Sequence, residues 1–209
     1  MAGNTPREFQ AVVRPYPKSA GVSSKTTILQ QIRDAKPAPR RLPNLPPDPS
    51  PDPAGWEEAF REVLAASKAT FVAPQNLLDY VKGSGARTIV STVAGIDGTL
   101  DLLAIDDPLQ LAGVDLAVLP ARLGVAENGA MWVSEAEAVH RVLPFITQHL
   151  LLVLERKDLV GTMHEAYRRI DIAATGFGVF IAGPSKTADI EQSLVIGAHG
   201  PRSLVVCLR

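Results

Sequence analysis

The sequence predicts an α/β fold, a three-layer α/β/α sandwich built on a mainly parallel or mixed sheet. From residue 56 onward, short apolar runs alternate with segments of helical periodicity. The runs are apolar on both alternating faces, which is typical of strands covered by helices on both sides. With 46% hydrophobic and 21% charged residues in a chain of 209, there is enough apolar material for one such core.

The expected elements follow in chain order. Residues 25–36 predict a short amphipathic helix with Ile28, Leu29 and Ile32 on one face and Ser24 as its N-cap. Further helices are expected over 56–64, 75–82 and 159–173, where apolar residues recur every three or four positions. Strands are expected over 88–93, 114–119, 130–133, 149–154, 177–182 and 203–208.

The chain divides near Gly55 into two parts. Eight of the seventeen prolines lie between residues 37 and 53, where locked φ angles and missing amide donors favour an extended polyproline II arm. Residues 1–54 are therefore expected to form an N-terminal helix and an extended arm, and residues 55–209 the α/β domain. The first part carries eight basic and four acidic side chains, the second thirteen and eighteen, so the two attract each other weakly. Such an arm can be exchanged between copies of the chain, which makes a homo-oligomer an expectation.

Charge and cysteine content exclude several classes of function. A net charge of −1 argues against nucleic acid as a partner, because neutralising phosphates needs an excess of Lys and Arg. Cys207 is the only cysteine, so the chain cannot supply the thiolates of an iron–sulfur or zinc cluster, and a reducing cytoplasm fits. The prolines among the first 24 residues leave no apolar stretch for an export signal, and no apolar run approaches the roughly 20 residues of a membrane span.

The loop that begins at Gly183 is the first candidate site. Gly183, Ser185, Lys186 and Thr187 combine small residues, two hydroxyls and an ammonium, a set that can bind an anion such as a small carboxylate or phosphate. The glycine spacing of the phosphate-binding nucleotide motifs is absent. The alternative is a plain turn and helix N-cap.

Glu127 is the second candidate, as a catalytic acid, base or nucleophile among small and apolar residues. The alternative is a tight turn between two strands, because Asn128-Gly129 is a strong hairpin signal.

The third candidate is the glycine-rich loop before the last predicted strand. There His199 can transfer protons, and Arg202 can hold a carboxylate or phosphate in bidentate fashion. A solvated or capping histidine is the alternative. The other histidines lack metal-ligand spacing and the aspartates near Asp101 lack the EF-hand pattern, so no metal site is expected.

Residues 181–204, IAGPSKTADIEQSLVIGAHGPRSL, closely resemble the signature SGPS(R/K)TADIEQ…GxHGPxxL of the lactate-utilisation (LUD) domain family. Ala126-Glu127-Asn128-Gly129 resembles the family's AETG turn, with Asn128 in place of the commoner Thr, and the preceding residues 119–124 depart from its usual Gly/Ala-Asp pattern. A weaker resemblance runs from about residue 55 to the end. The positions that match the family's motifs are Glu127, Gly183, Pro184, Ser185, Lys186, Thr187, Asp189, Glu191, Gln192, His199, Gly200 and Arg202.

The resemblance implies a fold similar to the ribose-phosphate isomerase and CoA-transferase group and a role in oxidising L-lactate to pyruvate. It also implies a complex in which cysteine-rich partner proteins carry iron–sulfur clusters, with no cofactor bound by this chain. Two other functions stay open. One is a stand-alone enzyme of the CoA-transferase or formyl-tetrahydrofolate cyclo-ligase type, with Glu127 as nucleophile or base. The other is a non-catalytic scaffold or regulatory binding module.

Overall fold

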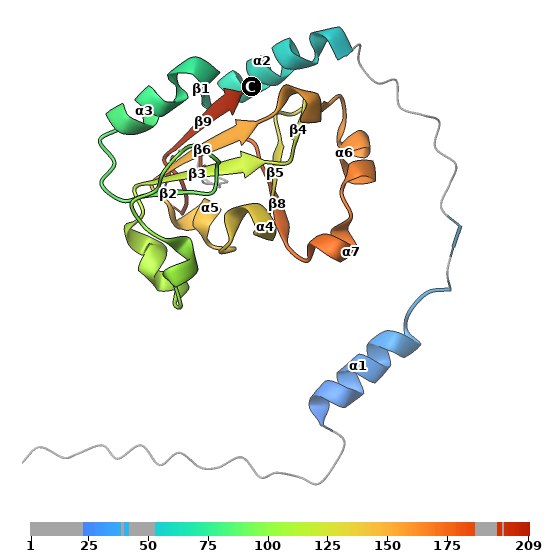
Figure 1. Cartoon of the computed structure of the whole chain (residues 1–209). Coiled ribbons are helices and arrows are strands. Elements are labelled where there is room, and N and C mark those ends of the chain that lie inside the picture. Colours follow the sequence, from blue (N-terminus) through green and yellow to red (C-terminus); the bar gives the residue numbers. More distant parts are fainter. Residues whose placement is uncertain (1–22, 39, 42–52, 187–195, 198) are drawn as a thin grey trace, which may run out of the picture. The chain divides into compact units, whose positions relative to one another are not determined.

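The computed structural model of the chain describes residues 23–38, 40–41, 53–186, 196–197 and 199–209 (Figure 1). The chain divides into two units, Met1–Pro46 and Pro47–Arg209. In the first unit the described element is the helix α1 (Ser24–Asp34). Ser23, rather than the predicted Ser24, is its N-cap, and its hydroxyl accepts a hydrogen bond from the Thr26 N–H at 3.3 Å. Most of the predicted extended arm lies outside the described residues.

The second unit is built on a five-stranded parallel sheet, which confirms the predicted α/β class. Its strands lie in the order β1 (Thr70–Val72), β9 (Ser203–Leu208), β6 (His149–Leu154), β3 (Leu116–Ala121) and β2 (Ile89–Ser91). All four neighbouring pairs run parallel. The three central strands are buried almost throughout, as their continuous apolar runs predict.

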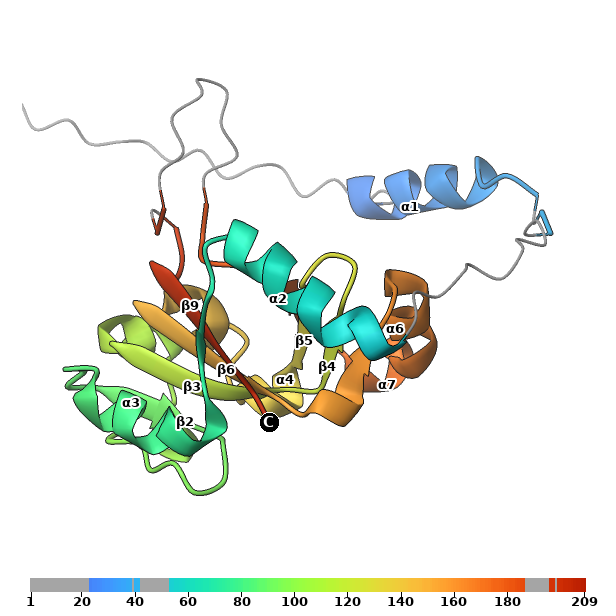
Figure 2. The same ribbon diagram turned by 90° about the horizontal axis from the view of Figure 1, so that it is seen from above.

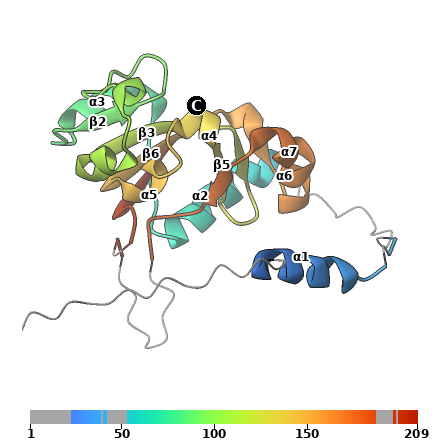
Figure 3. The same ribbon diagram turned by 90° about the horizontal axis from the view of Figure 1, so that it is seen from below.

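Helices cover both faces of this sheet. On one face, Leu77 and Val81 of α3 (Leu77–Gly83) pack in a cluster with Val118 and Leu151. The opposite face packs in one large cluster with residues of α2 (Trp56–Ala66), α4 (Glu135–Ala138) and α5 (Leu143–Ile146). Figure 1 shows α3 and α5 on opposite sides of the sheet, and Figure 3 shows the side that carries α4 and α5.

A second, mixed sheet of four strands was not predicted. Its order is β7 (Leu159–Val160), β4 (Leu123–Val125), β5 (Met131–Ser134) and β8 (Gly178–Ile181). One face of it contributes Met131 and Val133 to the large cluster, and the other packs Trp132 and Val160 with Ala166 of α6 (Met163–Arg169). Figure 2 shows β4 and β5 between the large sheet and α6.

The predicted helix over 159–173 is wrong in part. Its first residues form β7, which pairs with β4, and the remainder splits into α6 and the short α7 (Ile172–Thr175). Thr162 begins α6 with a capping box shared with Glu165, which fixes the start of the helix. The apolar spacing of residues 159–173 fits a helix, but the first two of these residues pair with β4 and form a strand instead.

Short 3-10 helices complete the connections: Pro53–Gly55, Pro74–Asn76, Leu102–Ala104, Pro108–Gly113 and Arg156–Asp158. Within the described ranges, no helix is long and apolar enough to cross a membrane.

Candidate functional site

Two chain segments that are distant in sequence are joined where the loop after β8 meets the loop before β9. The Ser185 N–H donates a hydrogen bond to the carbonyl of Pro201 at 2.8 Å, and the Gly197 N–H donates to the carbonyl of Ser185 at 2.8 Å. Lys186 and Ile196 form an isolated antiparallel bridge. These backbone contacts hold the two loops side by side, so the motif residues act as one structural unit.

A cavity of about 400 Å³ opens beside these joined loops. Four of the predicted site residues line it: Gly183, Ser185, Lys186 and His199. The rest of its wall is apolar and includes Phe145, in the residues before β6. The cavity therefore combines one ammonium, one hydroxyl and one imidazole with an apolar wall, a combination that suits a small carboxylate or phosphate ester.

Glycine is required at position 183. Its φ of +144° lies in a region that side chains rarely adopt, and a Cβ there would lie 3.0 Å from the Ser67 carbonyl oxygen and 3.7 Å from the Lys186 Nζ. The glycine therefore lets the loop pass close to the end of α2 while the lysine side chain folds back beside it. This close approach is a physical reason for the Gly-Pro-Ser-Lys sequence.

The cavity lies at the amino ends of strands of the large sheet, where ligands are less often found. Pro201 and Phe145 precede β9 and β6, so the joined loops sit at the amino ends of these parallel strands. In open α/β sheets, ligands usually bind beyond the carboxyl ends of the strands. The loop does follow the carboxyl end of β8, but β8 belongs to the mixed sheet and pairs antiparallel with β5.

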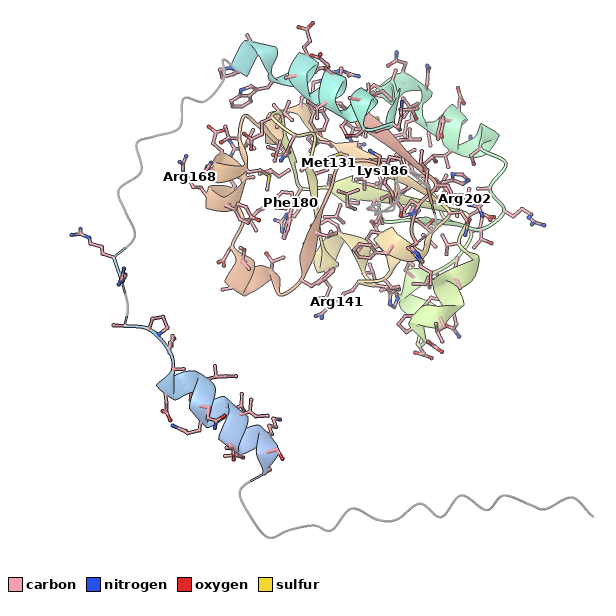
Figure 4. All side chains as sticks on the ribbon, turned by 180° about the vertical axis from the view of Figure 1, so that it is seen from behind. Met131, Arg141, Arg168, Phe180, Lys186 and Arg202 are labelled. Carbon is pink, nitrogen blue, oxygen red and sulfur yellow. The ribbon has the colours of Figure 1, made fainter. Side chains whose placement is uncertain are left out.

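Arg202 is not brought into this cavity. Its backbone N–H donates a hydrogen bond to the Gln148 carbonyl at 2.8 Å, and its side chain lines a larger neighbouring cavity of about 780 Å³. Figure 4 labels Arg202 and Lys186. Thr187, also predicted to bind an anion, lies outside the described residues.

Glu127 lies in the turn that joins β4 and β5, an antiparallel pair. The hairpin alternative is therefore confirmed for this segment. The Glu127 Oε1 accepts a hydrogen bond from the Met163 N–H at 2.7 Å, and its carboxylate so satisfies a free donor at the first turn of α6. Glu127 lines neither of the two cavities described above.

Among the residues that the structure describes, no three His, Cys, Asp or Glu side chains converge as metal ligands do. Cys207 is fully buried in β9, and burial raises the pKa of its thiol. A thiol in this state is a poor nucleophile and a poor ligand.

Sequence reasoning missed two features of this region. The apolar wall around Phe145 comes from a segment about forty residues upstream of the loop, and no local pattern signals that contact. It also missed Arg87 and His149, which line the larger cavity with Arg202. Their position in the sequence could have indicated this, because each lies at or just before the amino end of a predicted strand, and the amino ends of parallel strands lie at the same end of a sheet.

Comparison with known proteins relates this chain to one family. The family model described as the LUD domain matches residues 109–208, which include β3 to β9 and both joined loops. An uncharacterized protein from Neisseria meningitidis serogroup B is 31% identical over 174 residues, which cover 72% of this chain and 74% of that protein.

Several relatives carry the name lactate utilization protein C. The protein from Deinococcus radiodurans is 28% identical over 92% of this chain and 96% of its own length. The protein from Shouchella clausii is 32% identical, but the match covers only 42% of this chain and 40% of that protein.

A crystal structure of a DUF162 family protein from Deinococcus radiodurans has a similar fold, with a TM-score of 0.57 at 18% identity. The similarity covers 75% of this chain and 98% of that one. At this identity it supports the fold alone.

Proposed function

The chain belongs to the LUD domain family, and from this membership we propose that it is the cluster-free subunit of a system that oxidises L-lactate to pyruvate. The observation that carries the proposal is the alignment over 92% of this chain with a protein named lactate utilization protein C. The joined loops support it, because they carry the family-like motif and line a cavity of suitable chemistry.

Oxidation of L-lactate removes two electrons and two protons from the substrate, so an electron acceptor must be present. With one cysteine, fully buried, this chain cannot supply the thiolates that hold an iron–sulfur cluster. We therefore place the clusters on partner proteins and the complex in the cytoplasm. A homo-oligomer formed through residues 1–54 remains part of the proposal.

Within this proposal, the cavity at the joined loops takes the carboxylate of the substrate. The Lys186 ammonium attracts the anion, and the Ser185 hydroxyl can donate a hydrogen bond to it. His199 lines the same cavity and can accept one of the two protons that the oxidation releases, while the second proton goes to solvent and the two electrons pass to the clusters of the partner proteins.

Growth on lactate tests the proposal directly. A strain lacking this gene is complemented with the wild-type chain, with Lys186→Gln, with His199→Asn and with Lys157→Gln. Lys157 is exposed in a 3-10 helix and lines neither cavity, so it is the matched control. We expect the Lys186 and His199 variants to grow slowly on lactate and normally on glucose, while the control grows as the wild type does.

Co-purification supplies the second measurement. Tagged protein is expected to bring down cysteine-rich partners whose clusters are reduced by L-lactate only when all components are present. If deletion of the gene leaves growth on lactate intact and no such partner is recovered, the proposal fails. If both site variants grow normally while removal of residues 1–36 abolishes growth, the chain is a scaffold rather than part of the substrate site.

A further inference from the structure

A second and larger cavity, of about 780 Å³, lies at the amino ends of four parallel strands. Its walls come from four separate segments, represented by Arg87 before β2, Asp115 before β3, His149 at the start of β6 and Arg202 before β9. Of these four residues, only Arg202 belongs to one of the sequence motifs. Because β9, β6, β3 and β2 are parallel neighbours in that order, the other three residues line the same end of the sheet as Arg202, with His149 on the strand next to it and Arg87 on the strand farthest from it.

Of the described residues that line this cavity, Asp115 alone carries a carboxylate, and that carboxylate accepts hydrogen bonds from backbone donors. The Asp115 Oδ2 accepts hydrogen bonds from the Arg87 N–H at 2.9 Å and the Thr88 N–H at 3.0 Å. These bonds, from Thr88 first and then Arg87, lower the pKa of Asp115 below its ordinary value of 3.8. Asp115 therefore stays ionised and holds the segment before β2 in place.

Two guanidinium groups also line the cavity, those of Arg87 and Arg202. Neither the Arg87 nor the Arg202 side chain forms a hydrogen bond or ion pair with a residue in the described ranges. Other arginines of this unit are paired with carboxylates: Arg61, Arg122, Arg141, Arg156 and Arg209. Among the described residues, the cavity thus has two guanidinium groups against one carboxylate, and of the two arginines only Arg87 interacts electrostatically with that carboxylate.

This excess of positive charge stands out against the rest of the domain. Residues 55–209 carry thirteen basic and eighteen acidic side chains, a net charge of −5. A concave surface of the opposite sign on an acidic domain concentrates anions locally. The charge of the cavity therefore favours an anionic ligand.

The side chains around the cavity are held in position. The His149 Nδ1 and the Ser203 Oγ are hydrogen-bonded at 2.8 Å, which orients the imidazole ring. A Cβ at Gly197 would lie 2.5 Å from the Cγ of Arg202, so only glycine leaves room for the arginine stem. The positive φ of Gly197, +77°, also favours glycine. The glycine before the His-Gly-Pro sequence thus serves to position Arg202.

We propose that this cavity is a binding site for a small organic anion, whose phosphate or carboxylate groups contact Arg87 before β2 and Arg202 before β9. Guanidinium groups bind both kinds of oxyanion in bidentate fashion. A volume of about 780 Å³ lies in the range of sites for nucleotide-sized or drug-sized ligands, and exceeds what a three-carbon acid fills. The site is separate from the cavity at Lys186, and the inference does not depend on a role in lactate oxidation.

Calorimetric titration of the full chain tests the site with four probes: AMP, inorganic pyrophosphate, citrate and L-lactate. We expect AMP, pyrophosphate or citrate to bind more tightly than L-lactate, and the ranking among them separates a phosphate from a carboxylate ligand. Arg87→Gln and Arg202→Gln are each expected to weaken that binding about tenfold or more, because each removes a charge-assisted pair.

Arg168→Gln is the matched control. Arg168 is an exposed arginine of α6, and Figure 4 shows it at the other end of the unit from Arg202. Thermal melting of each variant checks that it is folded, which is expected because Arg87 and Arg202 are exposed. The proposal is overturned if no probe binds with a Kd below about 1 mM, if the doubly substituted protein binds as tightly as the wild type, or if Arg168→Gln weakens binding equally.

Discussion

The carboxylate of Glu127 and the backbone N–H of Met163 are hydrogen-bonded at 2.7 Å, which ties the β4–β5 turn to the first turn of α6. Two further backbone bonds run beside it, from Ala126 to Val160 and from the Glu127 N–H to the carbonyl of Gly161. These three hydrogen bonds connect the β4–β5 turn to β7 and to the start of α6. A negative charge at this point also complements the positive end of the helix dipole.

Replacement of Glu127 is therefore expected to lower the stability of the fold. Glu127→Ala should reduce the free energy of unfolding by about 0.5–1 kcal/mol, and Glu127→Gln by less, because the amide oxygen can still accept the Met163 N–H. Urea unfolding followed by circular dichroism measures both. Glu62→Ala, at an exposed position of α2, is the control and should change little. Equal stability of Glu127→Ala and the wild type would contradict the capping role.

Gly178 is expected to be intolerant of any side chain. A Cβ at this position would lie 2.2 Å from the Cζ2 of Trp132, whose ring packs at a tilt against Phe180 with centroids 4.8 Å apart. Gly178→Ala must displace the indole and should cost about 1–3 kcal/mol of unfolding free energy. Tryptophan fluorescence during urea unfolding gives the midpoint.

Gly83→Ala is the comparison for this variant. A Cβ at Gly83 meets nothing within 4 Å and lies in helix α3, so alanine there should be neutral or stabilising. A loss of stability at position 83 as large as that at position 178 would show that the crowding against Trp132 is not the cause.

Asp115 gives stability a defined dependence on pH. Hydrogen bonds from the N–H groups of Thr88 and Arg87 lower its pKa in the folded state below the ordinary value of 3.8. Its contribution is therefore present at pH values above 3.8 and is lost as the pH falls through the folded-state pKa. In urea midpoints measured from about pH 5 down to about pH 2, the wild type should lose stability more steeply than Asp115→Asn.

Asp97→Asn serves as the control for this series, because Asp97 is exposed in a loop and accepts no hydrogen bond from a described residue. Its profile should follow that of the wild type. Parallel profiles for Asp115→Asn and the wild type would mean that the two backbone bonds do not favour the ionised carboxylate.

The sequence predicts the centre of the fold better than its edges. The strands over 149–154 and 203–208 are predicted to the residue, because each is a run of five apolar residues that follows a polar residue and ends at a charged one. The strands β1, β4 and β7 are only two or three residues long, too short for any periodicity, and they exist through pairing with distant partners. The second sheet was missed for this reason.

The residues of the candidate site could likewise be predicted from the sequence only in part. The motif loops were identified from their residues, and the structure brings Ser185 and His199 to one cavity. Arg202, close to His199 in sequence, lines the other cavity instead, because Gly197 and the bond to Gln148 direct it there. The direction in which the Arg202 side chain points depends on backbone φ angles and on packing, which residue types alone do not specify.

Cys207 lies fully buried on β9, a strand that has neighbours on both sides in the large sheet. A thiol reagent can reach its sulfur only after β9 has separated from the helices and strands around it. The rate of modification of this single thiol by a large excess of reagent should therefore report how often the centre of the sheet opens. Cys207 is thus a natural probe of the opening of the large sheet, and no label has to be introduced to use it.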